Sequence, residues 1–347
     1  MGRHNTLTAT GRRAFMAAAG AGAIATLAGC SGGENGADEG TVRMMTATDT
    51  STAYAANEGL AAVINENTDD DEELFVEALP GPGTEGNIGA LNNEETEMAY
   101  LQNWAMELIN NEEEPYDELD FQPAQVFHFY QLPWFFVTPH EEIEMLSDLE
   151  EDHQMSPTPE GAGTRAALEQ ALSYAVDDFD DTSYDYGEQG AAMDEGRLDV
   201  GVGTFMNYQI DPGWQQEMMS TVDTYVIDID EDIVEQWEDD PGLAVGSFPG
   251  EDLEYAAGAP ETAYTPVFEY NFVARQDFDY DTLYRFLELL HGHRDELESY
   301  HELLGAMEDE EFFTDLLYDD TPVHAAAYDF WEEQGLDIDG YERADEP

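Results

Sequence analysis

The chain has 347 residues, with 80 Asp or Glu against 10 Lys or Arg, so its formal net charge is −70 at pH 7. This charge excludes a nucleic-acid-binding surface, and an anionic bilayer surface would repel it. An apolar content of 42% with 12% aromatic residues is enough to build hydrophobic cores, which excludes global disorder.

The first predicted element is an export signal over residues 1–30, which contain no acidic residue. Arg12 and Arg13 precede an Ala/Gly-rich stretch, residues 14–29, which is shorter than the ~20 residues of a membrane-spanning helix. The arginine pair resembles a twin-arginine signal, which exports proteins that are already folded. We therefore expect the mature protein to lie outside the cytoplasm.

Cys30 closes the string Leu-Ala-Gly-Cys, which resembles a lipobox. In a lipobox the cysteine is lipidated and becomes the first residue of the mature chain. The alternative is a small buried residue, but Cys30 is the only cysteine and stands where cleavage is expected. We expect a lipid anchor on Cys30 at the outer face of the cell membrane, followed by a flexible tether over residues 31–40.

Short strands and helices alternate in the remaining body, which predicts an α/β fold. A body of roughly 300 residues exceeds one comfortable core, so we expect two lobes. Strands are expected at residues 42–46, 74–79, 98–101, 126–138, 155–157, 198–203, 224–229 and 263–275. Helices are expected at residues 51–65, 87–91, 164–175, 281–306 and 322–334. Pro133 suggests a break or an edge position in the run 126–138.

The most informative local motif is Pro-Glu-Gly-Ala-Gly-Thr-Arg at residues 159–165, between a strand and a helix. Glycines let the backbone approach a ligand, and the N–H groups and dipole of a helix start favour an anion. Arg165 would add a cation suited to a carboxylate. The alternative is a helix start capped by Thr164, with Arg165 paired to nearby acids.

A second cluster of hydroxyl residues occupies residues 46–54, at another strand-to-helix junction. Such a loop offers hydrogen-bond donors and acceptors to a polar ligand. A capped helix start without a ligand is the alternative, and the residues alone do not separate the two.

Other candidate motifs do not form a chemical site. His291 and His293 have too few possible ligands around them for a metal and are expected at the surface. Residues 228–232 resemble the start of a calcium loop, but Ile233 stands where that loop needs glycine. Residues 246–250 are out of register for a nucleophile elbow. We therefore expect no metal, no cofactor and no catalytic residue.

Five segments, in order, resemble the TAXI-type solute-binding proteins of TRAP transporters. These are a Thr-rich opening loop, an Asn-containing helix with a strand ending in Gln, a Gly-x-Gly-Thr-Arg turn, a Gly-Arg-x-Asp segment and a Pro-x-His segment. They lie at residues 46–60, 84–102, 161–165, 193–200 and 322–328. The resemblance covers residues 42–335.

The resemblance implies a type II-like, two-lobed periplasmic-binding-protein fold with two hinge crossings and a ligand cleft between the lobes. Lobe one would combine residues 41–137 and 262–347, and lobe two would be residues 138–261. It also implies a receptor without enzymatic activity, which delivers a small organic or amino acid to a TRAP membrane permease. Family ligands are small carboxylates such as glutamate or 2-oxoglutarate.

The binding residues are carried over by position from the family motifs. They are Thr48, Ser51, Thr52, Tyr54, Thr84, Asn87, Gln102, Gly163, Thr164 and Arg165. Two residues depart from the family pattern: Asp49 has entered the opening loop, where it would hold an amino group or disfavour a dianion. Trp104 follows the strand that ends in Gln102, where it would stack against a ligand.

Two other functions remain open from the sequence. An orphan receptor that presents its solute to a membrane sensor would share every motif above. A secreted hydrolase on an α/β scaffold needs a nucleophile and a base, and no such pair is identified.

The acidic surface generates the first prediction, a strong dependence of folding on salt. Self-repulsion opposes the compact state in dilute buffer, whereas at about 1 M salt the Debye length falls to roughly 3 Å. We expect the melting temperature, followed by circular dichroism, to rise steeply from dilute to molar KCl. Equimolar sucrose, which does not screen charge, should not reproduce the rise. Equal stability with and without salt would contradict this interpretation.

Overall fold

Two long antiparallel strands, β4 (Pro123–Thr138) and β10 (Thr262–Arg275), form the centre of the main sheet in a computed structural model of the chain. The structure describes residues 40–49, 51–69, 73–113, 116, 119–160, 162–176 and 179–345. They belong to one unit, Ala37–Pro347. The predicted export signal with Cys30, and the tether up to residue 39, lie outside the described residues.

The main sheet has eight strands in the order β2-β1-β3-β10-β4-β7, with β9 paired to β10 and β8 paired to β4. The remaining strands are β1 (Thr41–Met45), β2 (Phe75–Leu79), β3 (Met98–Gln102), β7 (Gly201–Thr204), β8 (Tyr225–Val226) and β9 (Ala244–Pro249). Strands β5 (Gln154–Met155) and β6 (Asp180–Asp181) pair separately. None of the described helices has the length and apolarity of a membrane span.

The first group of elements repeats a strand-then-helix unit. Strands β1, β2 and β3 are followed by α1 (Thr52–Asn67), α2 (Thr84–Asn92) and α3 (Asn103–Asn110). Strand β1 pairs in parallel with both β2 and β3. The carboxyl ends of parallel strands share one edge of a sheet, so the starts of these helices gather at that edge.

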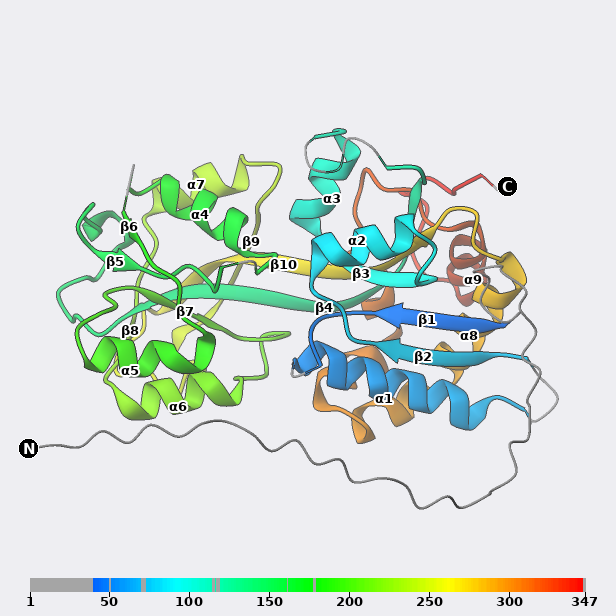
Figure 1. Cartoon of the computed structure of the whole chain (residues 1–347), viewed down its shortest axis with the longest axis horizontal. Helices are drawn as coiled ribbons and strands as arrows, with labels where there is room; N and C mark the ends of the chain where they lie inside the picture. The colour runs from blue at the N-terminus through cyan, green and yellow to red at the C-terminus, as the bar shows by residue number, and fades with distance from the viewer. Residues whose placement is uncertain are drawn as a thin grey trace, which may run out of the picture. The chain divides into compact units, whose positions relative to one another are not determined.

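The second group of elements lies between β4 and β10 in the chain. Its helices are α4 (Arg165–Ser173), α5 (Gln189–Asp194), α6 (Gly213–Thr221) and α7 (Glu231–Glu238). Short 3₁₀ turns occur at η1 (Leu146–Asp148), η2 (Tyr186–Glu188) and η3 (Gly250–Asp252). Figure 1 shows this group at one end of β4 and β10, and the first group at their other end.

After β10 the chain returns to the first group. It forms α8 (Tyr280–Gly292), the 3₁₀ turns η4 (Arg294–Ser299), η5 (Glu302–Glu308) and η6 (Glu310–Phe313), and α9 (Ala325–Gln334). Trp331 of α9 is fully buried and donates its indole N–H to the carbonyl of Val126 in β4, at 2.8 Å. The last helix is thereby fixed against the first half of β4.

Strands β4 and β10 change neighbours partway along. From Trp134 onward β4 pairs with β7, and up to Val267 β10 pairs with β9. Their other halves pair with each other, and β10 also pairs with β3. The chain therefore crosses between the two groups twice, which confirms the predicted α/β, two-lobed fold. The predicted lobe boundaries, 41–137 plus 262–347 and 138–261, stay a prediction.

Pro133 was expected to break its strand or to lie at an edge, and this expectation is wrong. Strand β4 continues through Pro133, which is opposite Val267 in the centre of the sheet. Its carbonyl accepts hydrogen bonds from Phe205 N at 3.2 Å and Thr204 Oγ1 at 2.7 Å. Proline has no N–H to donate to a neighbouring strand. It is tolerated here because β4 stops pairing with β10 at Pro133 and begins to pair with β7 at Trp134.

Two further expectations about the last third of the chain are wrong. The single helix expected over residues 281–306 ends at Gly292, and 3₁₀ turns follow. Glycine is a poor helix former, and His293 adopts a non-helical conformation after it. His291 is not at the surface but is 9% exposed, with its ring packed against Phe330 and Trp331.

A buried polar network links the two central strands. His128 of β4 is fully buried and its Nδ1 lies 2.7 Å from Asn271 Oδ1 of β10. Burial lowers the pKa of His128 to about 4, because the charged imidazolium would be desolvated. The histidine thus remains neutral in the native state at a pH where the unfolded chain binds a proton.

This difference predicts an acid-dependent loss of stability from His128. Its folded pKa lies below the unfolded value, so its contribution is present above pH ~6.5 and is lost as the pH falls towards 4. Between pH 7 and 5 we expect wild type to lose about 2 kcal/mol more free energy of unfolding than His128→Gln. Urea titrations in molar KCl measure this difference.

The comparison with the variant is needed because other groups titrate in the same range. Burial also lowers the pKa of His324 to about 4, whereas it raises the pKa of Glu269 to about 7, an effect of opposite sign. Val126→Ala, a cavity in the same strand, serves as control and should keep the wild-type pH slope. Equal slopes in wild type and His128→Gln would contradict the assignment.

Candidate functional site

A cavity of about 350 Å³ lies where the two groups of elements face each other. Loops after β1 and β2 line it from the first group, and the turn before α4 lines it from the second. Side chains of β4 and β10 complete it. The lining residues are Ala47, Thr48, Ser51, Thr52, Ala53, Pro82, Gly83, Thr84, Tyr100, Tyr130, Leu132, Trp134, Ala162, Gly163, Thr164, Tyr186, Thr204, Met206, Trp214 and Tyr270.

The first turns of four helices contribute to this lining. Thr52 and Ala53 begin α1, Thr84 begins α2, Thr164 precedes α4 and Trp214 lies in the first turn of α6. The first N–H groups of a helix lack partners within the helix, and its dipole places partial positive charge there. The cavity is therefore suited to an anion, although none of its lining residues is charged.

Hydroxyl groups surround these helix starts. Ser51 caps α1 by accepting a hydrogen bond from Tyr54 N at 3.1 Å. Thr164 occupies the cap position of α4, but its side chain makes no cap bond. The start of α2 also has no side-chain cap. Neither start therefore has a side-chain cap, although the N–H of Arg165 at the start of α4 donates to the carbonyl of Ala162 at 3.0 Å.

Three tyrosines from neighbouring strands form the floor of the cavity on the first-group side. Tyr130 of β4 and Tyr270 of β10 are directly opposite in the ladder and stack at 4.8 Å, with Tyr100 of β3 edge-on to Tyr270 at 4.6 Å. Each is at most 5% exposed. Burial raises the pKa of all three phenols, so they remain neutral.

A second aromatic stack lines the other side. The Tyr186 ring lies 5.5 Å from that of Trp134 and 5.1 Å from that of Trp214, each pair inclined by 25°. Trp134 is 3% exposed, and its Nε1–H has no hydrogen-bond partner. A buried donor without a partner costs about 1–3 kcal/mol, so the cavity wall holds an unsatisfied polar group.

The structure brings six of the ten predicted binding residues to this cavity. Thr48, Ser51, Thr52, Thr84, Gly163 and Thr164 all line it. The two groups approach each other closely at Gly163, where a Cβ would lie 3.1 Å from Thr84 Oγ1. A larger residue at this position would have to displace the Thr84 side chain by a few tenths of an ångström.

Three other predicted residues do not line the cavity, and two of them hydrogen-bond to backbone groups of its lining residues. Gln102 donates from Nε2 to the carbonyl of Gly163 at 3.2 Å and accepts from Ala105 N at the start of α3. Asn87 is fully buried and donates to the carbonyl of Tyr100 at 3.1 Å. Tyr54 lies on the first turn of α1, and it is not among the lining residues.

Arg165 was expected to bind the ligand's carboxylate, and the structure does not bring it to the cavity. Its guanidinium forms ion pairs with Asp181 and with Glu169, the latter at 2.7 Å, and donates to the carbonyl of Thr158. Pairing with nearby acids was the alternative interpretation of this motif. Its contacts fix the turn before α4, so it acts on the site through the backbone.

The two departures from the family pattern also lie outside the lining. Trp104, expected to stack on a ligand, instead packs against Gly242 of the second group, where a Cβ would lie 2.6 Å from its ring. Asp49 is exposed. Neither residue contacts the cavity.

Sequence reasoning missed the aromatic residues of the site. Tyr130, Leu132 and Trp134 alternate along β4, and alternate residues of a strand point to one face. The alternation is present within the run 126–138, but this run is apolar on both faces. The sequence therefore did not indicate which face would line a cavity. Tyr186 begins the 3₁₀ turn η2 and Trp214 lies in the first turn of α6, and no periodic signal marked them.

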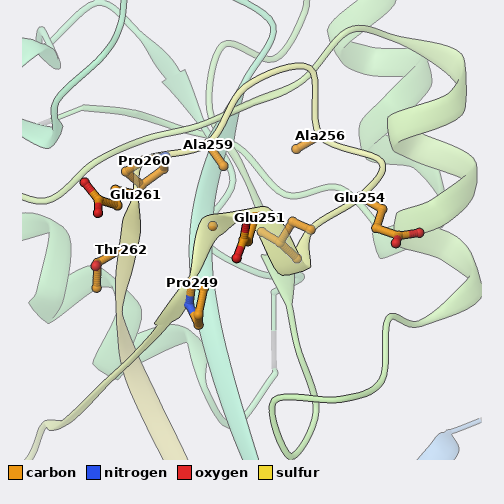
Figure 2. Close-up of a pocket in the computed structure, with 10 residues that line it drawn as sticks. Pro249, Glu251, Glu254, Ala256, Ala259, Pro260, Glu261 and Thr262 are labelled. Atoms are coloured by element: carbon orange, nitrogen blue, oxygen red, sulfur yellow. The ribbon is translucent and has the colours of Figure 1, made fainter.

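A second, larger pocket of about 710 Å³ lies between the end of β9, η3 and the start of β10 (Figure 2). Three glutamates, Glu251, Glu254 and Glu261, line it, and no cation does. Figure 2 shows the side chains of Glu254 and Glu261 directed away from each other. No group of His, Cys, Asp and Glu in the described residues is arranged to hold a metal. The glutamates of this pocket therefore do not converge on one point, as the ligands of a metal or a small molecule would.

A sequence model of the NMT1-like family matches residues 44–335 of the chain. No curated protein sequence matches it. Among solved structures, the periplasmic aliphatic sulphonate binding protein of Escherichia coli is similar at 11% identity and a TM-score of 0.43, covering 87% of this chain and 81% of its own. Protein AF1704 of Archaeoglobus fulgidus is similar at 15% identity and a TM-score of 0.45, covering 86% and 98%.

The contact between Trp104 and Gly242 generates a prediction about how the two groups meet. In Gly242→Ala the added Cβ would overlap the indole, so Trp104 must move. We expect acrylamide to quench tryptophan fluorescence more strongly in this variant than in wild type. Gly89→Ala is the control, because its Cβ meets nothing within 4 Å. Unchanged quenching in Gly242→Ala would contradict the contact.

Proposed function

The chain belongs to the NMT1-like family, and on this premise we propose that it is an extracytoplasmic solute-binding receptor for a membrane transporter. The proposal rests on the cavity between the two groups of elements. Among the described strands, only β4 and β10 run through both groups. Such an arrangement lets a ligand contact both groups and hold them together. No nucleophile with an adjacent base lines the cavity, so a receptor is favoured over the secreted hydrolase.

The proposed solute is a small carboxylate, of which glutamate and 2-oxoglutarate are the examples that the TAXI resemblance implies. Its carboxylate is received by the N-terminal turns of α1, α2 and α4, with the hydroxyls of Ser51, Thr84 and Thr164 beside them. This assignment replaces Arg165 as the anion-binding group. Backbone N–H groups at helix starts bind anions without a charged side chain.

The proposed partners follow from the sequence motifs. The lipid anchor on Cys30 and the twin-arginine signal would hold the receptor at the outer face of the membrane, where a TRAP permease would take up the solute. An orphan receptor coupled to a membrane sensor is the second candidate. Uptake of labelled solute can be measured in vesicles that contain a TRAP permease encoded beside this protein. Uptake that depends on the receptor favours transport, since a sensor gives no uptake.

Loss of one lining hydroxyl tests the site directly. In Thr84→Val the cavity keeps its shape but loses a hydrogen bond to the carboxylate. Hydrogen bonds to charged groups contribute about 1.5–3 kcal/mol, so we expect the affinity for a bound acid to fall by ~10-fold or more. Titration calorimetry in molar KCl, after a thermal-shift screen of organic and amino acids, measures the change.

Thr221→Val is the matched control, because Thr221 is exposed at the end of α6 and donates to the carbonyl of Glu217. It should bind the acid as wild type does. The proposal fails if no small molecule in the screen stabilises the protein, or if Thr84→Val and Thr221→Val bind equally well.

A further inference from the structure

We infer that the cavity selects a monocarboxylate with an apolar or aromatic body and rejects dicarboxylates. This inference rests on the proposed function and narrows its substrate class. It follows from the aromatic stacks facing the helix starts, and from the neutral character of every lining residue. The selected solute thus differs from the glutamate and 2-oxoglutarate that the family resemblance implies.

The cavity offers favourable electrostatics to a single carboxylate. The helix starts provide partial positive charge for one carboxylate, near the Ser51, Thr84 and Thr164 hydroxyls. Arg165, the arginine of the turn before α4, already pairs with Asp181 and Glu169. A second carboxylate would therefore be buried among aromatic rings without a counterion, and an unpaired buried charge is strongly unfavourable.

Aromatic rings form much of the cavity wall. Six aromatic residues line the cavity, and they form two clusters. One cluster is Tyr100, Tyr130 and Tyr270, and the other is Trp134, Tyr186 and Trp214. Rings that already stack on each other offer an outer face or an edge to a further apolar group. These walls suit an alkyl chain or a ring and leave a second anion without partners.

The volume of the cavity limits the size of the solute. A cavity of about 350 Å³ has the volume of roughly a dozen water molecules at ~30 Å³ each. It therefore has room for a short chain or a single ring beyond the carboxylate. The Nε1–H of Trp134 has no hydrogen-bond partner but is itself buried, so it is not a donor that a second carboxylate could reach. A second carboxylate would need further donors and a cation, and no charged residue lines the cavity.

The test uses matched ligands and calorimetry in molar KCl. Hexanoate and adipate differ only in a terminal methyl against a terminal carboxylate, and 3-phenylpropionate and 3-phenylpropanamide differ in charge. We expect adipate to bind at least about tenfold more weakly than hexanoate, because its second charge is unpaired. We expect the amide to bind more weakly than 3-phenylpropionate.

Substitutions of Trp214 test which aromatic residues contact the apolar part of the solute. Trp214→Ala should weaken binding of 3-phenylpropionate by about tenfold, and Trp214→Phe should recover much of it, which also guards against a folding defect. Tyr255→Ala is the control, because Tyr255 is 51% exposed and outside the cavity.

The outcomes separate the inference from the proposed function. If adipate binds as tightly as hexanoate, the selection for a single charge is wrong while a carboxylate receptor stands. If the amide binds as tightly as the acid, or if Trp214→Ala binds as wild type does, the inference also fails. If none of the acids, including glutamate and 2-oxoglutarate, binds at all, the proposed function itself fails.

Discussion

Strands β4 and β10 pair from Pro133 opposite Val267 to Pro123 opposite Arg275, and beyond this ladder both continue into the second group of elements. Every part of the cavity depends on this pairing. It aligns Tyr130 with Tyr270 at the floor and sets the distance between the helix starts of the two groups. Small changes at the point where the ladders change would therefore move whole groups of lining residues.

The surface and the cavity follow opposite electrostatic rules. A formal charge of −70 belongs to the chain as a whole, yet no Asp or Glu lines the cavity. Buried carboxylates would oppose an anionic ligand, whereas hydroxyls and helix N–H groups leave the site neutral and locally favourable to one negative charge. In the proposed receptor the solute would be bound by oriented dipoles, which surface acidity and molar salt affect less than exposed ion pairs.

The sequence was sufficient to predict the fold class, and six of the ten residues carried over from the family motifs line the cavity. It was insufficient for Arg165, since in a chain this acidic an arginine finds partners such as Asp181 through tertiary contacts that spacing does not show. The aromatic walls were missed for a related reason. Tyr186 and Trp214 meet Trp134 only after folding brings η2 and α6 to β4.

A structure of the protein with a bound organic acid would test the central claim most directly. The account predicts one carboxylate within hydrogen-bond distance of backbone N–H groups at the starts of α1, α2 or α4, with the rest of the ligand against Trp134, Tyr186 or Trp214. Arg165 would still be paired with Asp181. A carboxylate bound by the guanidinium of Arg165, or a ligand in the pocket beside Glu251 and Glu261, would contradict it.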